Sequence, residues 1–180
     1  MLLLCFTAAK PQSELVQNSF GFPKSLYMQN FIDVWYSEGL LHFLGNSLLV
    51  SGGVVFGTVL LSALAGYGMA QIHFPGKAIL RVVLVLGLVV PVETLVIPLF
   101  YMMKQFGLLS TYYAMVLPQI GLGLPFGILL IHSFMLGLPP ELFETAEMDG
   151  CNSWKRFWWV AFPLLRPALV GVGIFQFIWS

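Results

Sequence analysis

Three stretches of this chain are so long and so apolar that they limit what it can fold into. They cover residues 47–70, 82–103 and 112–135. Each matches the roughly 20 residues that a helix needs to cross a bilayer. Lipid supplies no water to bond backbone N–H and C=O groups, so a spanning segment must be a helix or part of a closed barrel. The apolar residues are continuous and do not alternate with polar ones. The sequence therefore predicts an all-α, polytopic bundle of transmembrane helices.

The composition of the chain points to the same class of protein. Charged residues make up 9% of the chain and hydrophobic residues 58%, whereas soluble domains carry about 25% charged residues. A membrane protein in contact with lipid is expected. The formal net charge of zero argues against nucleic acid as a partner. Cys5 and Cys151 are far apart and show neither a disulfide framework nor metal-ligand spacing. No metal and no cofactor are expected.

Both ends of the chain resemble parts of further spans. The apolar run at residues 1–9 lacks the basic n-region of a signal peptide and is interpreted as the end of a span. Residues 167–180 are interpreted as the start of another span. Residues 10–46 are polar and mixed, and an extracytoplasmic segment is expected there. We therefore expect the chain to be part of a longer membrane protein.

The distribution of basic residues predicts which connectors face the cytoplasm. Residues 71–81 and 136–166 lie on one side of the membrane and hold five basic residues: Lys77, Arg81, Lys155, Arg156 and Arg166. The opposite side holds three, which are Lys10, Lys24 and Lys104. Cytoplasmic loops carry an excess of Lys and Arg. The sequence therefore predicts that residues 136–166 form a cytoplasmic loop.

Glycine and proline recur within the expected spans. Gly53 and Gly57 are four residues apart, as are Gly123 and Gly127, and this spacing lets helices approach closely in lipid. The prolines, each of which favours a kink, are Pro91, Pro98, Pro118 and Pro125. Such spans suit a protein whose helices line a path or move. The alternative is that they are ordinary membrane helices, which are generally rich in Gly and Pro.

The loop at residues 136–166 contains a segment with helix signals at both ends. Pro140 suits the first helical position, and Gly150 suits the position just past the last turn. A helical wheel places Leu142, Phe143, Ala146 and Gly150 on one face and Glu141, Glu144, Thr145 and Met148 on the other. A helix this short is not stable alone in water. It needs a docking surface, with one face offering apolar contact and the other carboxylates for a cationic group. The alternative is a solvated acidic helix that only keeps the loop soluble.

A second short helix is expected after this segment. Asn152 and Ser153 are good caps, and the tryptophans of the following run WKRFWWVAF favour the membrane–water interface. Pro163 and Pro167 are expected to end this helix before the next span begins.

The order of residues in this loop resembles a known motif. E-x-A-x-x-D-G is followed, after nine residues, by an aliphatic residue, one further residue, an apolar residue and proline. This resembles the cytoplasmic EAA loop of the permease subunits of binding-protein-dependent ABC importers. The matching positions are Glu144, Ala146, Asp149, Gly150 and Pro163, with Val160 and Phe162 at the apolar positions.

Other stretches are similar to the carbohydrate-type, maltose-permease-like branch of that family: GNSLLVS, LAGYGMAQIHFPGK, PVETLVIPLF and PPELFETAEMDG. The resemblance covers residues 45–180.

This resemblance implies a function and a set of partners. The chain would be part of a six-span permease in the plasma (inner) membrane of a bacterium or archaeon, and one half of a homodimeric or heterodimeric pore. Its partners would be a cytoplasmic ABC ATPase dimer, a second permease subunit and an external solute-binding protein. The solute would be a sugar, oligosaccharide or polyol. The residues implied in coupling to the ATPase are Glu141, Leu142, Phe143, Glu144, Ala146, Asp149, Gly150 and Pro163. The chain has no Gly-rich phosphate loop, so it is not expected to be an enzyme, and ATP hydrolysis is expected on a separate subunit.

Two polar residues within the expected spans are candidates for a solute path. Glu93 lies in the stretch 82–103, where an ionisable group is costly and usually faces a cavity or a partner. It could accept a hydrogen bond from a solute hydroxyl, couple transport to protons, or bond a neighbouring helix and hold the kink at Pro91. Gln119 lies beside Pro118 in the third span and could also face a path.

Other functions remain open at this point. The chain could be an ABC permease for another small solute, such as a glycerol phosphate. It could be a secondary transporter that uses Glu93 and depends on a proton gradient. An intramembrane enzyme would need convergent polar groups within the spans, and a membrane scaffold would not need spans broken by proline.

Overall fold

The computed structural model describes residues 7–8, 10–11, 21, 27–36 and 39–180. They belong to two compact units, Met1–Leu48 and Leu49–Ser180. The span end expected at residues 1–9 lies outside the described residues apart from Thr7 and Ala8, and so does part of the extracytoplasmic segment expected at 10–46. The first unit contains the short helix α3, Gln29–Tyr36.

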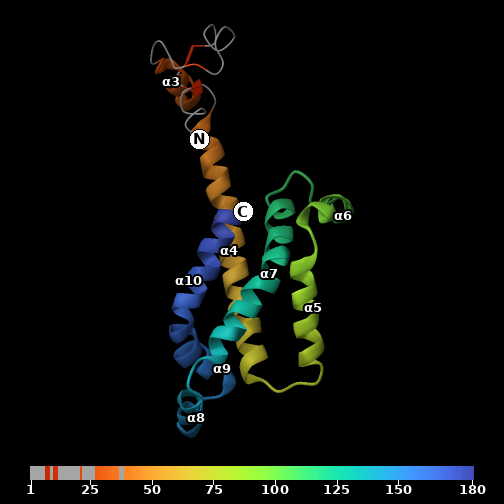
Figure 1. Ribbon diagram of the computed structural model, residues 1–180, viewed down its shortest axis with the longest axis vertical. Coiled ribbons are helices and arrows are strands. Elements are labelled where there is room, and N and C mark those ends of the chain that lie inside the picture. Colours follow the sequence, from red (N-terminus) through yellow and green to blue (C-terminus); the bar gives the residue numbers. More distant parts are fainter. Residues whose placement is uncertain (1–6, 9, 12–20, 22–26, 37–38) are drawn as a thin grey trace. The chain divides into compact units, whose positions relative to one another are not determined.

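The second unit is built from helices, and the described residues contain no strand. In chain order they are α4 (Leu40–Gln71, which begins in the first unit), α5 (Lys77–Val89), α6 (Val92–Gln105), α7 (Tyr113–Leu136), α8 (Glu141–Met148), α9 (Ser153–Arg156), the π-helix η1 (Phe157–Ala161) and α10 (Phe162–Trp179). Among the described residues, three helical segments are long and apolar enough to cross a membrane: Leu40–Gln71, Tyr113–Leu136 and Ser153–Trp179. The prediction of an all-α, polytopic membrane protein is confirmed (Figure 1).

The second apolar stretch is broken where one helix was expected over residues 82–103. The axes of α5 and α6 differ in direction by 102°. Val90 is extended with ψ 121°, and Pro91 follows with ψ 128°. Proline has no N–H and disfavours the helical conformation of the residue before it. Pro98, Pro118 and Pro125, by contrast, lie inside helices that continue past them. The span expected over residues 82–103 is therefore divided into two helices at Pro91, one of the positions where the sequence predicts a kink.

The last span also begins earlier than expected. The helical segment runs without interruption from Ser153 to Trp179 through η1, so Pro163 and Pro167 do not end it. In η1 the N–H of Phe162 bonds to the carbonyl of Phe157, five residues back. Pro163 follows directly, at the start of α10, where the wider turn accommodates a residue that has no N–H to donate.

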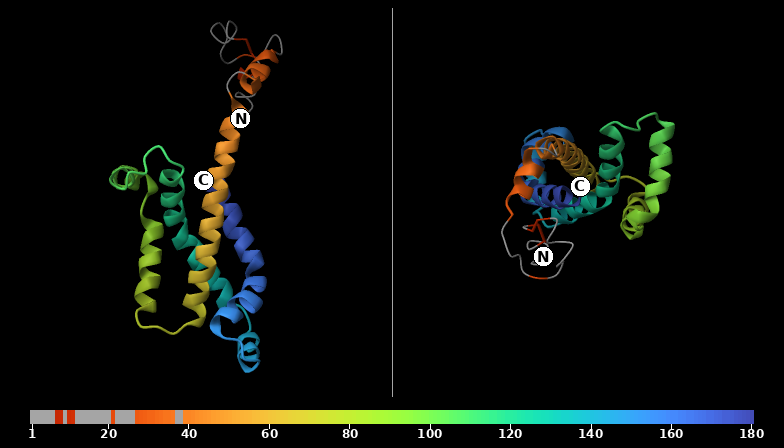
Figure 2. Two further views of the ribbon diagram at one scale, coloured as in Figure 1. Left: turned by 180° about the vertical axis from the view of Figure 1, so that it is seen from behind. Right: turned by 90° about the horizontal axis from the view of Figure 1, so that it is seen from above.

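Helices α4, α7 and α10 pack closely through glycines, and Figure 2 shows them side by side. A Cβ added at Gly66 of α4 would lie 2.6 Å from Cγ2 of Ile131 on α7. At Gly127 of α7 it would meet the hydroxyl of Ser62 on α4 and lie 3.4 Å from Val172 on α10. The predicted close approach is confirmed at Gly57, Gly123 and Gly127, whereas a Cβ at Gly53 would lie 3.6 Å from Val116, which is an ordinary contact.

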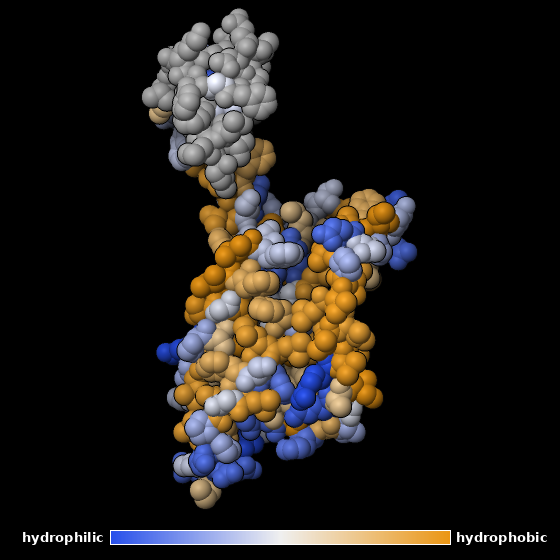
Figure 3. All heavy atoms as spheres, in the orientation of Figure 1, coloured by the Kyte–Doolittle hydropathy of each residue, from blue (hydrophilic) through white to orange (hydrophobic). Residues whose placement is uncertain are grey.

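The surface of the second unit divides by polarity. Figure 3 shows hydrophobic side chains over its middle and hydrophilic ones gathered at the end that carries α8. Many large apolar side chains of α5 and α6 are exposed, for example Val89, Ile97 and Tyr101. An apolar exterior of this kind suits contact with lipid, where exposed apolar groups carry no hydration penalty.

Candidate functional site

Helix α8 ends at a backbone motif that the sequence predicts. Gly150 adopts a left-handed conformation with φ 78°. Its N–H donates to the carbonyl of Glu147, and the N–H of Cys151 donates to the carbonyl of Ala146, both at 3.0 Å. This pair of bonds is the Schellman arrangement that stops a helix. A residue with a Cβ would cost roughly 1–2 kcal/mol in the left-handed conformation, so glycine sets the end of α8 and the direction of the chain after it.

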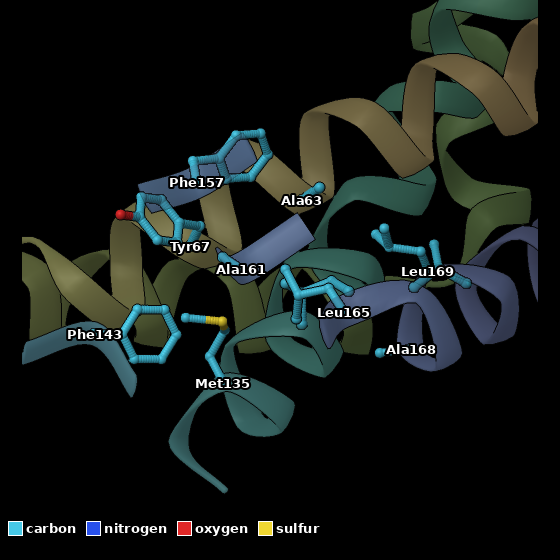
Figure 4. Close-up of a cluster of buried hydrophobic side chains, with 11 residues drawn as sticks. Ala63, Tyr67, Met135, Phe143, Phe157, Ala161, Leu165, Ala168 and Leu169 are labelled. Carbon is cyan, nitrogen blue, oxygen red and sulfur yellow. The ribbon is translucent and has the colours of Figure 1, made fainter. Parts of the chain in front are cut away.

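The apolar face of α8 packs against the chain itself. Phe143 is 4% exposed and Ala146 is 8% exposed. Phe143 belongs to a buried cluster that includes Tyr67 of α4, Met135 of α7 and Phe157 of η1 (Figure 4). The docking surface that this short helix requires is therefore supplied by the helix bundle. Phe143 and Ala146 are thus buried against the chain itself and hold α8 on the bundle, and any part that they have in coupling is through the position of this helix.

The residues of α8 that remain exposed form what we call the outer face: Glu141, Leu142, Glu144, Thr145, Glu147 and Met148. Leu142 is 42% exposed and Met148 is 81% exposed, so two apolar side chains lie among the carboxylates. Glu141 and Glu144 stand in the first turn, where a negative charge is favoured by the helix dipole. This surface combines apolar contact with negative charge, and it projects away from the bundle.

Polar contacts also join α8 to α9 and α9 to the bundle. Arg156 Nη1 lies 2.7 Å from Glu147 Oε2, and the hydroxyl of Tyr67 donates to the carbonyl of Ser153 at 3.0 Å. Asn152 caps α9 as predicted, because its side chain accepts a hydrogen bond from the N–H of Lys155 at 2.9 Å. Phe143 thus packs α8 on the bundle, Glu147 joins α8 to α9, and Ser153 joins α9 to α4.

Two other loop residues of the motif lie apart from the outer face. Asp149 is the C-cap of α8, and its N–H donates to the carbonyl of Thr145. Pro163 is exposed at the start of α10, beyond η1. The structure thus gives Asp149 a place at the end of α8 and Pro163 a place in the following helix.

A cavity of about 410 Å³ lies between α5, α7 and α10. It is lined by Gly87, Leu88, Val90, Val92, Gln119, Leu122, Gly123, Phe126, Phe175, Gln176 and Trp179. It borders the break between α5 and α6, and these elements lie toward the end of the second unit opposite α8 in both side views (Figures 1 and 2). A second cavity, of about 450 Å³, lies on the α6 side and shares Gln119 with the first.

Two glutamines place carboxamide groups in the lining of the first cavity. Gln176 on α10 is 2% exposed, and its Nε2 donates to the backbone carbonyl of Gln119 on α7 at 3.4 Å. Oε1 of Gln119 is buried and has no hydrogen-bond partner. Gly123 lies directly against the carboxamide of Gln176. The same two helices also contribute aromatic rings, and those of Phe126 on α7 and Phe175 on α10 are 4.3 Å apart between centroids.

The structure separates the two residues that the sequence proposed for a solute path. Gln119 lines both cavities, whereas Glu93 lines neither. Glu93 is exposed in the first turn of α6, directly after the break, and not in the middle of a continuous span. Sequence reasoning missed Gln176, although a carboxamide inside the apolar run GIFQFIW is costly in lipid without a partner and could have marked it. No group of three His, Cys, Asp or Glu side chains in the described part is placed to hold a metal ion.

Comparison with known proteins identifies the family. Residues 40–180 match the family described as binding-protein-dependent transport system inner membrane component. The chain belongs to this family. The family is one of transport components of the membrane, so the resemblance of the loop to that of importer permeases is confirmed.

Several relatives are permeases of carbohydrate transport systems. The chain is 30% identical to the diacetylchitobiose uptake system permease protein NgcG of Streptomyces coelicolor, over 99% of this chain and 59% of that one. It is 32% identical to the arabinooligosaccharides transport system permease protein AraQ of Halalkalibacterium halodurans, over 98% of this chain and 64% of that one. The chain thus spans about three-fifths of the length of these relatives.

The fold is also that of a solved transporter. A crystal structure of a bacterial ABC transporter involved in the import of the acidic polysaccharide alginate matches with a TM-score of 0.80. The match covers 98% of this chain and 62% of that one at 18% sequence identity. This similarity shows that the helices of the two chains are arranged alike.

Proposed function

We propose that this chain is the permease subunit of an ATP-driven importer that moves a sugar, oligosaccharide or polyol. Three findings support the proposal: the family, the names of the relatives, and the arrangement of α8. In this proposal an external binding protein delivers the solute, a second permease subunit completes the pore, and a cytoplasmic ABC ATPase dimer hydrolyses ATP. The excess of basic residues in residues 71–81 and 136–166 supports a cytoplasmic location of α8.

The observation that carries the proposal is the division of α8 into two faces. Phe143 and Ala146 anchor it in the bundle, while the outer face offers Leu142 and Met148 among carboxylates. A partner that binds the outer face can therefore move the bundle through Phe143 and through the Glu147–Arg156 ion pair. We assign the outer face to a groove of the ATPase, where Glu144 would meet a basic group. Closure of the ATPase dimer on ATP would then displace α4, α9 and α10 together.

Reversing the charge of Glu144 tests this assignment. In the full-length subunit, assembled with its partners in proteoliposomes, Glu144→Lys should insert normally but lose uptake together with the ATP hydrolysis that the binding protein stimulates. The physical reason is that a positive charge would face the basic group of the groove. Solute uptake and phosphate release, measured on the same vesicles, check this prediction.

Asp33→Lys is the control, because Asp33 is also an exposed carboxylate but lies on α3, outside the loop. It should leave uptake and hydrolysis as in the wild type. Wild-type uptake by the Glu144→Lys complex would contradict the docking role of α8.

A further inference from the structure

We infer that the cavity between α5, α7 and α10 binds the hydroxyl groups of the solute, and that the carboxamide of Gln176 is the polar group that receives them. This inference rests on the proposed function and adds to it a location and a contact residue. If α8 faces the cytoplasm, the cavity lies in the half of the bundle nearer the external binding protein, where a delivered solute first enters.

The first argument is that the buried carboxamides of Gln176 and Gln119 are incompletely hydrogen-bonded. The 3.4 Å contact of Gln176 Nε2 with the Gln119 carbonyl is longer than the 2.7–3.2 Å typical of N–H···O bonds. Oε1 of Gln119 has no partner. Leaving a buried polar group unpaired costs about 1–3 kcal/mol. A hydroxyl is both donor and acceptor, and so is a carboxamide, so a bound polyol could satisfy both groups.

The second argument is the position of the helix break. The last four carbonyls of α5 lack partners within the helix. Non-helical backbone at membrane depth is tolerated where it is buried in protein or lines a water-filled cavity. Val90, which is extended, and Val92, which begins α6, both line this cavity. Transporters use broken helices in this way at their binding sites, because the free backbone groups become available to a solute.

The third argument is the shape and lining of the cavity. Its volume of about 410 Å³ lies within the roughly 300–1,000 Å³ of small-molecule pockets. Such pockets combine apolar and aromatic walls with a few polar groups. Phe175 packs on Phe126, and its ring is parallel to that of Trp179 within 9°. Aromatic faces suit the C–H face of a sugar ring, which leaves the hydroxyls at the ring edge for Gln176 and Gln119.

Gly123 makes it possible to displace the carboxamide without removing it. A Cβ at this position would collide with Oε1 of Gln176 and lie 2.8 Å from its Cδ. Gly123→Ala should therefore turn the side chain of Gln176 away from its present position. Gly121, on the same helix, has nothing within 4 Å of an added Cβ, so Gly121→Ala is the matched control.

The first experiment measures uptake and ATP hydrolysis by the full-length subunit in its assembled complex. Diacetylchitobiose, arabinotriose and maltose are offered as probes, and the variants are compared on whichever is taken up. Gln176→Leu keeps the volume of the side chain and removes its polar atoms. Loss of one buried hydrogen bond of about 1.4 kcal/mol corresponds to roughly a tenfold fall in uptake per ATP. Stimulated hydrolysis should stay at the wild-type level, because α8 is untouched.

The expected order is a large fall for Gln176→Leu, a smaller one for Gly123→Ala, and none for Gly121→Ala. Gln105→Leu, which removes an exposed carboxamide at the end of α6, should also have no effect. Wild-type uptake by both Gln176→Leu and Gly123→Ala would overturn the inference. These outcomes differ from failure of the proposed function, in which the wild type takes up none of the probes or Glu144→Lys retains uptake.

A second experiment detects the solute in the cavity directly. Leu122→Cys places a thiol in the cavity lining, in a chain where Cys5 and Cys151 are replaced by Ser. A maleimide should react with this thiol in the assembled complex, and an excess of the transported probe should slow the reaction several-fold. Glycerol 3-phosphate should not slow it, and labelling of Gln105→Cys should be insensitive to every probe. An unreactive Leu122→Cys, which would mean that protein fills the cavity, or a rate unaffected by the probe, would overturn the inference.

Discussion

Neighbouring residues of α8 have opposite environments, although both are apolar. Phe143 is buried in the cluster with Met135 and Phe157, whereas the adjacent Leu142 is 42% exposed on the outer face. One therefore holds the helix in place, and the other is available to a partner. This division explains how a helix of eight residues, too short to be stable alone, is held in place while its other side chains stay accessible.

Substituting these two residues separates the two roles. Phe143→Ala should lower the thermal stability of the purified subunit, because removing a buried phenyl ring and leaving a cavity costs about 3–5 kcal/mol. Leu142→Ala should leave the unfolding temperature unchanged and weaken binding of the ATPase. Thermal unfolding in detergent and co-purification of the ATPase distinguish the two. Equal destabilisation by both variants would show that Leu142 is also a packing residue.

The break between α5 and α6 is the feature that most alters the expected membrane topology. Pro91 removes a backbone donor and keeps Val90 extended, so the chain turns through 102° instead of continuing. This change of direction separates the last carbonyls of α5 from the first turn of α6. It leaves Val90 and Val92, on either side of Pro91, in the lining of the cavity. Pro98, which lies inside α6, has no such effect.

Replacing Pro91 tests whether the break matters for transport. Pro91→Ala restores the missing donor and should straighten the pair, which would close the cavity wall and lower uptake several-fold. Spin labels at Ile79 and Tyr101 should then move toward a separation of about 33 Å, the length of 22 residues of continuous helix at 1.5 Å each. Pro98→Ala is the control and should change neither uptake nor the label distance. An unchanged distance in Pro91→Ala would show that tertiary packing alone holds the break.

At the scale of the whole molecule, the two sites that we propose lie toward opposite ends of the second unit. The outer face of α8 is at one end, and the Gln119–Gln176 cavity is toward the other. The helices between them, α4, α7 and α10, are in close contact at Gly66, Gly123 and Gly127. Close-packed interiors transmit displacement because they compress little. A displacement of α8 can therefore reach the cavity through these helices.

For the whole assembled transporter, we predict that ATP and not a proton gradient drives uptake. In liposomes loaded with ATP, uptake by the assembled complex should continue when a protonophore removes the proton gradient, and it should stop when ATP is omitted. The reason is that the proposed drive acts through α8, whereas Glu93, the group that proton coupling would require, lines neither cavity. Uptake that is abolished by the protonophore in the presence of ATP would favour the proton-coupled alternative.

The sequence alone determined the features that depend on residues close together in the chain or on the composition of a long segment. The apolar content of its long runs predicted helices in a membrane, because the cost of unpaired backbone groups in lipid leaves few other structures. The end of α8 at Gly150 could also be predicted from the sequence, since the Schellman hydrogen bonds involve only residues 146–151. The E-x-A-x-x-D-G motif led to the family for the same reason, because its residues are neighbours in the chain.

The tertiary structure alone decided which proline breaks a helix, which apolar residue of α8 is buried, and which residues meet across the bundle. Four prolines in the apolar runs had the same expected effect, yet only Pro91 divides a helix in the described part of the chain. Phe143 and Leu142 were placed on one face of the predicted helix, and packing against Met135 and Phe157 buried only the first. Gln176 meets Gln119 across 57 residues of sequence. Each of these outcomes depends on contacts between segments that are distant in the sequence, and a local sequence pattern does not predict the free energies of such contacts.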